Sequence, residues 1–456
     1  MKHTFFISAI AFAAALCAAS AQADDGTFEF HGYSRGGPVL NTSDGVKGRF
    51  QLGGDVQGYR LGNEGDNGIE IDLIKTFKTD GANYKVQYMP AKWNSGNVGT
   101  EQAFVEISGM GFAPEAKFWV GQRRLRIQDV HIVDYFLLNY GDNQGAGVTD
   151  IPIGGAKLGL GIFTGDKFDT ASVAGVTATR FNADISDIAI NPGGKLRVLM
   201  TGVNGTGLAD TNTGAGISVS HNQTDFLTKG LNNALFLQTS SGHARIDGEF
   251  ESIDGVGAGK KVTRIADSLS WQMGAFGGQT LLAYQTNKDE KTGVETKDTS
   301  IGGRISYAFS KNFKLLVDAA TTTRTGNGPD QRLDKLTIAP TLSVGPDFYS
   351  RPELRLYVTM SNWNDAAAAA NAAAAAAASA EGGETPVPAP VVAPVAKTAD
   401  AKRKKGRDKV SENKQEMFEQ LSELRINKKQ IDRVVQKLKS LVMRIEKGEA
   451  ELEEFE

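Results

Sequence analysis

Cysteine is nearly absent from this sequence: Cys17 is the only one among 456 residues. A chain with one cysteine cannot form an internal disulfide, so hydrogen bonding and packing must hold its fold together. Proline is also scarce, at 13 residues, whereas glycine reaches 53. This balance favours many strands joined by tight turns over a disordered chain.

Long hydrophobic runs are missing as well. Beyond residue 23 no stretch approaches the roughly eighteen consecutive apolar residues that a membrane-spanning helix needs. An excess of positive charge is also lacking, since the formal net charge is −3. These absences exclude a helical membrane protein and argue against a nucleic-acid-binding surface over the chain as a whole.

The N-terminus has the features of a secretory signal peptide. Met1-Lys2-His3 is a short basic start, an apolar run follows, and Ala21-Gln22-Ala23 provides small residues at a cleavage site. We therefore expect residues 1–23 to be removed and the mature chain to begin at Asp24. Cys17 lies inside this segment, and Leu16 before it does not suit lipoprotein processing.

Between Phe28 and Met360 the recurring unit is a stretch of seven to ten residues in which apolar and polar side chains alternate. Ile69, Ile71 and Leu73 alternate with Glu70 and Asp72 in one example. Successive side chains of a strand point to opposite faces, so each segment has one apolar and one charged side. Turn signals such as Asn191-Pro192-Gly193-Gly194 separate the segments.

Two all-β architectures use such strands. A soluble sandwich buries the apolar faces against a second sheet, whereas an outer-membrane β-barrel turns them toward lipid and encloses water with its charged faces. Export, together with more than three hundred residues of strands rich in charge on one face, favours the transmembrane antiparallel barrel. We expect this barrel to occupy residues 24–365, with outer-membrane lipid as its surroundings.

The chain changes character near Asn364. Residues 366–410 are rich first in alanine, then in proline and valine, and finally in lysine, as linkers are. In residues 411–456 apolar side chains recur every three or four positions, from Met417 to Leu452. This spacing predicts an amphipathic helix or coiled coil.

Five stretches of the sequence resemble maltoporins, the carbohydrate-specific porins of Gram-negative outer membranes. They occur in the family's order, over about residues 27–365. The stretches are FHGYSR (Phe30 to Arg35), YRLGNE (Tyr59 to Glu64), GQRRLRIQDVHIVDYF (Gly121 to Phe136), INPGGKL (Ile190 to Leu196) and YSRPELRLYVT (Tyr349 to Thr359).

The resemblance implies a barrel of eighteen strands, a homotrimer, and facilitated diffusion of maltodextrins or related oligosaccharides. It also implies an inward-folded loop that narrows the pore, and a row of aromatic side chains, the slide, beside charged residues. Carried over position by position, the aromatic slide comprises Tyr33, Trp93 and Tyr349, with Trp93 at a position contributed by the adjacent subunit. Phe136 stands at the constriction, and the polar track comprises Arg35, Arg60, Arg123, Asp129 and Asp134.

The sequence also departs from the family. Gly68 and Leu231 stand near positions where aromatic residues are expected, so the slide is thinned and another oligosaccharide than maltodextrin is an open alternative. The alternation stops after Trp363, where the family has a further strand that closes the barrel. An unclosed barrel would leave two unpaired strand edges facing lipid. We therefore expect the last strand to be missing, through a frame change or gene fusion.

The tail allows a second interpretation. Residues 423–432 resemble a helical segment of primary sigma subunits of bacterial RNA polymerase, so the alternative function is an interaction protein that joins a truncated barrel to a partner-binding helix. No serine-histidine-acid constellation or metal-ligand spacing appears among His31, His131 and His221. We therefore expect neither an enzyme nor a cofactor.

Overall fold

The computed structural model describes residues 26–39, 50–94, 96–133, 135–167, 177–206, 213–251, 259–326 and 328–371. The chain divides into two compact units, Met1–Val391 and Val392–Glu456, and every described residue belongs to the first. The expected signal peptide, most of the expected linker and the expected tail helix therefore lie outside the described residues.

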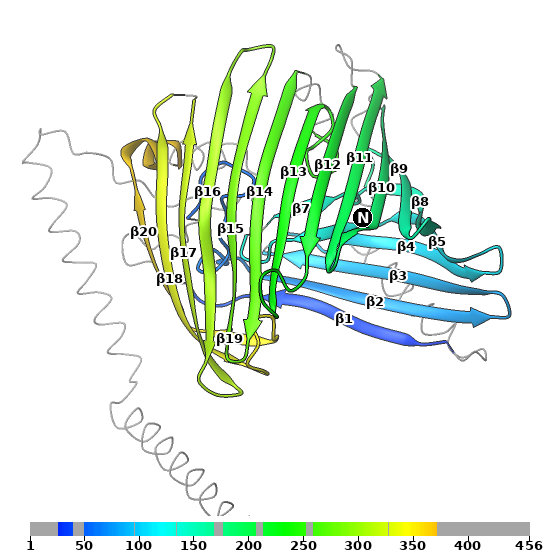
Figure 1. Cartoon of the computed structure of the whole chain (residues 1–456), viewed down its shortest axis with the longest axis horizontal. Helices are drawn as coiled ribbons and strands as arrows, with labels where there is room; N and C mark the ends of the chain where they lie inside the picture. Colours follow the sequence, from blue (N-terminus) through cyan, green and yellow to red (C-terminus); the bar gives the residue numbers. More distant parts are fainter. Residues whose placement is uncertain are drawn as a thin grey trace, which may run out of the picture. The chain divides into compact units, whose positions relative to one another are not determined.

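Antiparallel strands dominate this unit (Figure 1). A short helical segment over residues 365–371 follows the last of them. Within the described ranges, no helix is long and apolar enough to cross a membrane. The strands are β1 (Phe28–Arg35), β2 (Gly68–Thr79), β3 (Ala82–Trp93), β4 (Gly99–Met110), β5 (Ala113–Gln122), β6 (Arg126–Asp129), β7 (Phe136–Asn139), β8 (Gln144–Ile153), β9 (Ala156–Thr164), β10 (Thr177–Asn191), β11 (Gly194–Thr206), β12 (Gly214–Gln223), β13 (Leu231–Gly242), β14 (Lys260–Met273), β15 (Phe276–Asp289), β16 (Glu295–Ala308), β17 (Phe313–Thr325), β18 (Gln331–Ser343), β19 (Glu353–Arg355) and β20 (Val358–Trp363).

Eighteen of these strands form one sheet, and β6 and β7 form a separate pair. Sheet neighbours follow the order of the chain, except that β5 pairs with β8 because β6 and β7 lie in the connection between them. β19 and β20 pair in turn with two parts of β18, so together they occupy one position at the edge of the sheet. Among the described residues, β1 has a register only with β2, and β20 only with β18. The all-β prediction is confirmed, and among the described residues the last strand ends at Trp363, where the alternation stops.

The two ends of the strands carry connections of different length. At one end tight turns join neighbours, as at Gly154 and Gly155, whose φ values of 57° and 91° favour residues without a side chain. At the other end long connections follow β1, β5 and β13. Parts of these three connections pack on the sheet, and we call residues 50–64, 123–143 and 243–251 the first, second and third inner segments.

The two faces of the sheet reverse the arrangement of a soluble protein. On β16, Asp298, Ser300 and Arg304 are at most 1% exposed, whereas Ile301 is 54% and Tyr307 50% exposed. Burying apolar surface away from water gains about 25 cal/mol per Å², so an outer face this rich in exposed apolar side chains suits contact with lipid hydrocarbon. The soluble sandwich, which needs these side chains in a dry core, does not fit.

The inner segments cover the polar face, and they contribute eight of the eighteen buried residues of the main apolar cluster. Ile132, Val133, Leu137 and Leu138 of the second inner segment are fully buried. They cluster with apolar residues of the wall, including Phe163 and Phe236. The main core therefore lies between an inward-folded connection, which includes the β6–β7 pair, and the wall of the large sheet.

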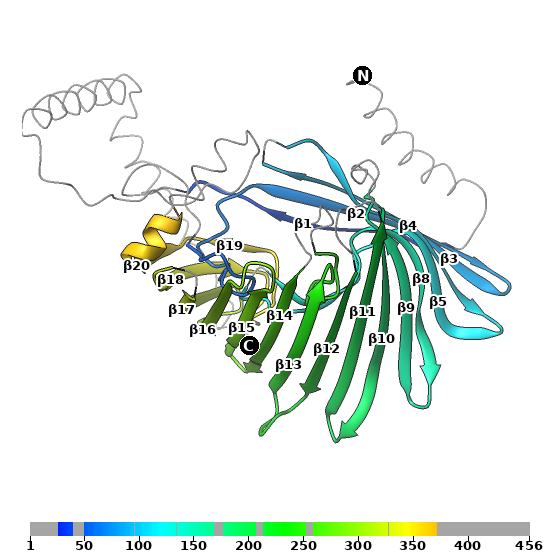
Figure 2. The same cartoon turned by 90° about the horizontal axis from the view of Figure 1, so that it is seen from above.

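The first inner segment crosses to the far strands of the sheet (Figure 2). The Tyr59 hydroxyl lies 3.0 Å from that of Ser300 in β16, and Lys335 of β18 donates to the Tyr59 carbonyl at 2.7 Å. Gly302 leaves room for the Tyr59 ring, because a Cβ there would lie 2.6 Å from it. The family resemblance implied one inward-folded loop, whereas three connections fold inward here.

Candidate functional site

Two of the predicted slide aromatics form a pair at the end of β1 and β3. The rings of Tyr33 and Trp93 have centroids 6.2 Å apart and an interplanar angle of 34°. Tyr33 is on the inner face of β1, opposite Glu70 of β2. Trp93 ends β3, directly opposite Gly68. A side chain at Gly68 would overlap the indole. The glycine that was expected to thin the slide therefore makes room for Trp93, one of the predicted slide residues.

Both predicted arginines of this region reach the aromatic pair. Arg60 donates to the Tyr33 hydroxyl at 2.9 Å, and Arg35 donates to it at 3.4 Å. The Arg35 guanidinium also lies 4.8 Å from the centre of the Trp93 ring, a cation–π contact. Tyr33, Trp93, Arg35 and Arg60 thus form one cluster, which we call the aromatic-arginine patch.

Carboxylates balance the charge of the patch. Glu64 accepts from Arg60 at 3.1 Å and from Arg355 of β19 at 3.0 Å, while Asp66 accepts from Arg35 at 2.7 Å. Burial alone would raise the pKa of Glu64, but Arg60 and Arg355 outweigh it and hold that pKa below its usual range. Glu64 is therefore ionised, and it connects the first inner segment to the opposite edge of the sheet.

Tyr349 belongs to a second aromatic group, in the connection between β18 and β19. Its ring meets His131 with centroids 5.5 Å apart and Phe348 at 4.8 Å. Arg351 donates to Nε2 of His131 at 2.7 Å, and Asp129 lies 3.8 Å from Nδ1 on the other side of the ring. The second inner segment thus meets the β18–β19 connection through His131, which contacts the predicted residue Tyr349 and also Arg351, a residue that was not predicted.

The remaining predicted residues lie elsewhere along the second inner segment. Arg123 forms an ion pair with Glu106 at 2.8 Å and lies over the Phe104 ring at 4.7 Å. Phe136 begins β7 and lies under the Arg126 guanidinium at 4.9 Å. Asp134 lies outside the described residues. The structure therefore brings six of the predicted residues together in two groups, rather than in one continuous row, and leaves Arg123 and Phe136 outside both groups.

Sequence reasoning missed several residues of these groups. Arg355 was present in the quoted stretch YSRPELRLYVT, and the alternation there places it on one face with Glu353 and Tyr357. Arg355 donates to Glu353 at 2.7 Å as well as to Glu64. The alternation in this stretch could therefore have indicated Arg355 as a site residue. His131 was assigned no ligand role, and its contact with Arg351 joins positions 220 residues apart, which no local pattern reveals.

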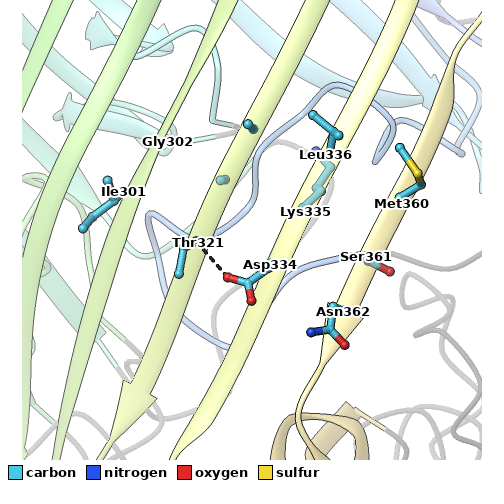
Figure 3. Close-up of a pocket in the computed structure, with 11 residues that line it drawn as sticks. Ile301, Gly302, Thr321, Asp334, Lys335, Leu336, Met360, Ser361 and Asn362 are labelled. Carbon is cyan, nitrogen blue, oxygen red and sulfur yellow. Dashed lines mark hydrogen bonds between the residues drawn. The ribbon is translucent and has the colours of Figure 1, made fainter.

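One groove lies away from these groups. It measures about 600 Å³ and runs along β16, β17, β18 and β20 (Figure 3). Its apolar side chains, Ile301, Leu336 and Met360, belong to the outer face of the sheet. The groove is therefore not part of the inner surface. In the described part of the chain, no three His, Cys, Asp or Glu residues are grouped so as to hold a metal ion.

Comparison with known proteins adds independent findings. The family model described as LamB porin matches residues 28–386. A maltoporin of Vibrio cholerae serotype O1 is 27% identical over 419 residues, covering 80% of this chain and 96% of the relative. A maltoporin of Hahella chejuensis is 26% identical over 386 residues, covering 78% and 90%.

Among solved structures, a BenF-like porin from Pseudomonas fluorescens Pf-5 matches 75% of this chain and 93% of its own, with 11% identity and a TM-score of 0.43. A loop-deletion mutant of OmpT, an outer membrane protein of Vibrio cholerae, matches 75% and 95%, with 12% identity and a TM-score of 0.41. The family model covers most of the chain, and its match includes every strand. The chain belongs to the LamB porin family and is a porin of a Gram-negative outer membrane.

Proposed function

We propose that this porin carries oligosaccharides, maltodextrins or related sugars, by facilitated diffusion, and that the aromatic-arginine patch is a sugar-binding site on their path. One observation carries the proposal: the Tyr33 and Trp93 rings lie 6.2 Å apart, with Arg35 and Arg60 at the Tyr33 hydroxyl. The maltoporin relatives support the same substrate class.

The chemistry of a pyranose fits this arrangement. A sugar ring has apolar C–H faces and a rim of hydroxyls, so an aromatic face can take the ring while charged groups exchange hydrogen bonds with the rim. Arginine donates and carboxylate accepts, and the patch offers both through Arg60 and Glu64. Because these charges balance, the patch suits a neutral sugar better than an ionic one.

Transport also requires that the sugar leave. Several weak sites in series release a substrate more readily than one tight site. The aromatic-arginine patch and the Tyr349 group provide two such sites, and Tyr349 is 52% exposed. We infer that a sugar passes from one to the other, with Phe136, Arg123, Asp129 and Asp134 bordering the narrow part of its path.

A catalytic role for Asp129 and His131 is a weaker candidate. An acid-histidine pair activates a nucleophile through the free nitrogen of the imidazole. Here Nε2 of His131, which would face that nucleophile, receives a hydrogen bond from Arg351 at 2.7 Å. The pair is therefore engaged in a structural contact, and we propose a channel rather than an enzyme.

We infer a homotrimer from the family resemblance. In that family a slide tryptophan comes from the adjacent subunit, and Trp93 occupies its position. Here Trp93 contacts Tyr33 and Arg35 of its own chain. We therefore expect the patch to be complete within one subunit. A change in oligomeric state should then leave the sugar affinity of each pore unaltered.

Planar-bilayer conductance of the purified full chain tests the proposed function. The ion current is recorded while maltohexaose or sucrose is titrated. Sugar-dependent interruption of the current is the expected result, and the sugar that blocks at lower concentration identifies the preferred substrate. Steady ion current that neither sugar interrupts would contradict the carbohydrate path while leaving the porin itself intact.

A further inference from the structure

A single hydroxyl group lies where the second and third inner segments meet the wall. Tyr135 of the second inner segment donates to Oδ2 of Asp247 at 3.0 Å. The Tyr135 hydroxyl oxygen in turn accepts from Arg245 at 3.3 Å and from Arg264 of β14 at 3.2 Å. One phenol thus satisfies a carboxylate and two guanidinium groups at once, and we call these four residues the Tyr135 junction.

The junction extends to the first inner segment. Arg264 is 1% exposed and donates to Asp55 at 2.9 Å. Its other donors reach Gln285 at 2.7 Å and Gln238 at 3.2 Å, on the two strands beside β14. The Arg264 guanidinium also faces the Tyr135 ring at 4.9 Å. All three inner segments and three neighbouring strands therefore meet at one buried group of charges.

Backbone contacts hold part of the second inner segment independently of this hydroxyl. Gln238 donates to the Leu137 carbonyl at 2.7 Å, and the Asn139 amide donates to the Asp247 carbonyl at 2.8 Å. The apolar cluster around Leu137 and Leu138 adds packing. We therefore expect the segment to remain folded against the wall without the Tyr135 hydroxyl, while the residues around position 135 gain freedom to shift.

Two residues of the inferred narrow part lie on this same stretch of chain. Phe136 follows Tyr135 directly, and Asp129 lies six positions before it. Asp247 accepts from the phenol hydroxyl and Arg264 donates to it. A displacement of Tyr135 would therefore move Phe136 relative to the wall and alter the width available to ions.

We propose that Tyr135 is a positioning residue: its hydroxyl, held between Asp247, Arg245 and Arg264, fixes the second inner segment and thereby sets the narrowest width of the pore. The proposal rests on the proposed function only in that the second inner segment borders the ion path. It does not depend on which sugar is carried, so the test uses ions alone.

The test compares single-channel recordings of Y135F and wild type in potassium chloride, without sugar. Losing a hydrogen bond to a charged group typically shifts an equilibrium by about ten-fold. We therefore expect brief departures from the main conductance level to become about ten-fold more frequent. The matched control is Y59F, which removes a buried hydroxyl that bonds to Ser300 in the wall, and its current should resemble wild type.

Thermal unfolding of the same proteins separates positioning from simple stabilisation. Y135F should keep a folded barrel and show altered current, whereas lower thermal stability with an unaltered current would overturn the proposal. An equal increase in departures from the main conductance level in Y59F and Y135F would also overturn the proposal. If Y135F does not assemble, D247N takes its place, since it removes the charge that faces the phenol and preserves the shape of the side chain. A wild-type current in D247N would then overturn the proposal.

Discussion

Gly68 and Trp93 stand opposite each other in the register of β2 and β3, and the indole occupies the space that a side chain at position 68 would need. We predict that G68A displaces the Trp93 ring from Tyr33 and weakens sugar block. The measurement is the sugar concentration that halves the current. G202A is the control, because a Cβ at Gly202 meets nothing within 4 Å. Unchanged block in G68A would show that Trp93 takes no part in sugar binding.

Removing the other ring of the pair should have a direct effect. Aromatic contacts of this kind contribute about 0.5–1.5 kcal/mol beyond the area they bury. We predict that Y33A weakens sugar block by roughly ten-fold with little change in open conductance, as a contact worth about 1.4 kcal/mol would.

Y284A is the matched control for Y33A, because Tyr284 is a tyrosine of β15 that is 42% exposed on the outer face. It should leave block unaltered. Sugar block that is as strong in Y33A as in wild type would remove Tyr33 from the sugar path.

The charge of Glu64 offers a readout that needs no sugar. Glu64 balances Arg60 and Arg355, and those two cations outweigh burial in lowering its pKa. We predict that E64Q removes one negative charge beside these arginines and shifts ion selectivity toward chloride. The reversal potential in a potassium chloride gradient measures this shift. E295Q removes a carboxylate whose side chain is 42% exposed at the end of β16 and should have a smaller effect. Identical reversal potentials for wild type and E64Q would argue against an ion path beside Glu64.

His131 predicts a dependence of stability on pH. Burial lowers the pKa of His131 and outweighs Asp129, which acts in the opposite direction, while Arg304, Arg351 and Arg60 lower it further. An unfolded histidine titrates near pH 6.5. As the pH falls below about 6.5, His131 is protonated in the unfolded chain but stays neutral in the folded chain. The stability that is present above that pH is therefore lost progressively, until the pH passes below the pKa of His131 in the folded chain.

The measurement is the unfolding temperature of wild type and H131Q between pH 7.5 and 5. The substituted glutamine can still accept from Arg351 but does not titrate, so H131Q should lose less stability in acid. H31Q is the control, since the His31 side chain is 60% exposed beside Glu29. An acid response of H131Q as large as that of wild type would contradict the assignment.

The sequence indicated the strands because their alternation is local. Ile301 and Ile305 point one way and Ser300 and Arg304 the other, whatever lies far along the chain. The end of the alternation at Trp363 likewise coincides with the end of β20. The match to motifs around Tyr33 and Arg60 then identified the family, and both residues do lie in one cluster.

The tertiary structure decided what the strands enclose. That Gly68 accommodates Trp93, that Arg355 reaches Glu64 and that three connections meet at Tyr135 follow from contacts between residues separated by as many as 291 positions. Such contacts depend on the curvature and register of the whole sheet, which no local spacing encodes. The sequence by itself determined which face of each strand is apolar and where the sheet ends, whereas only folding decided which side chains meet inside it.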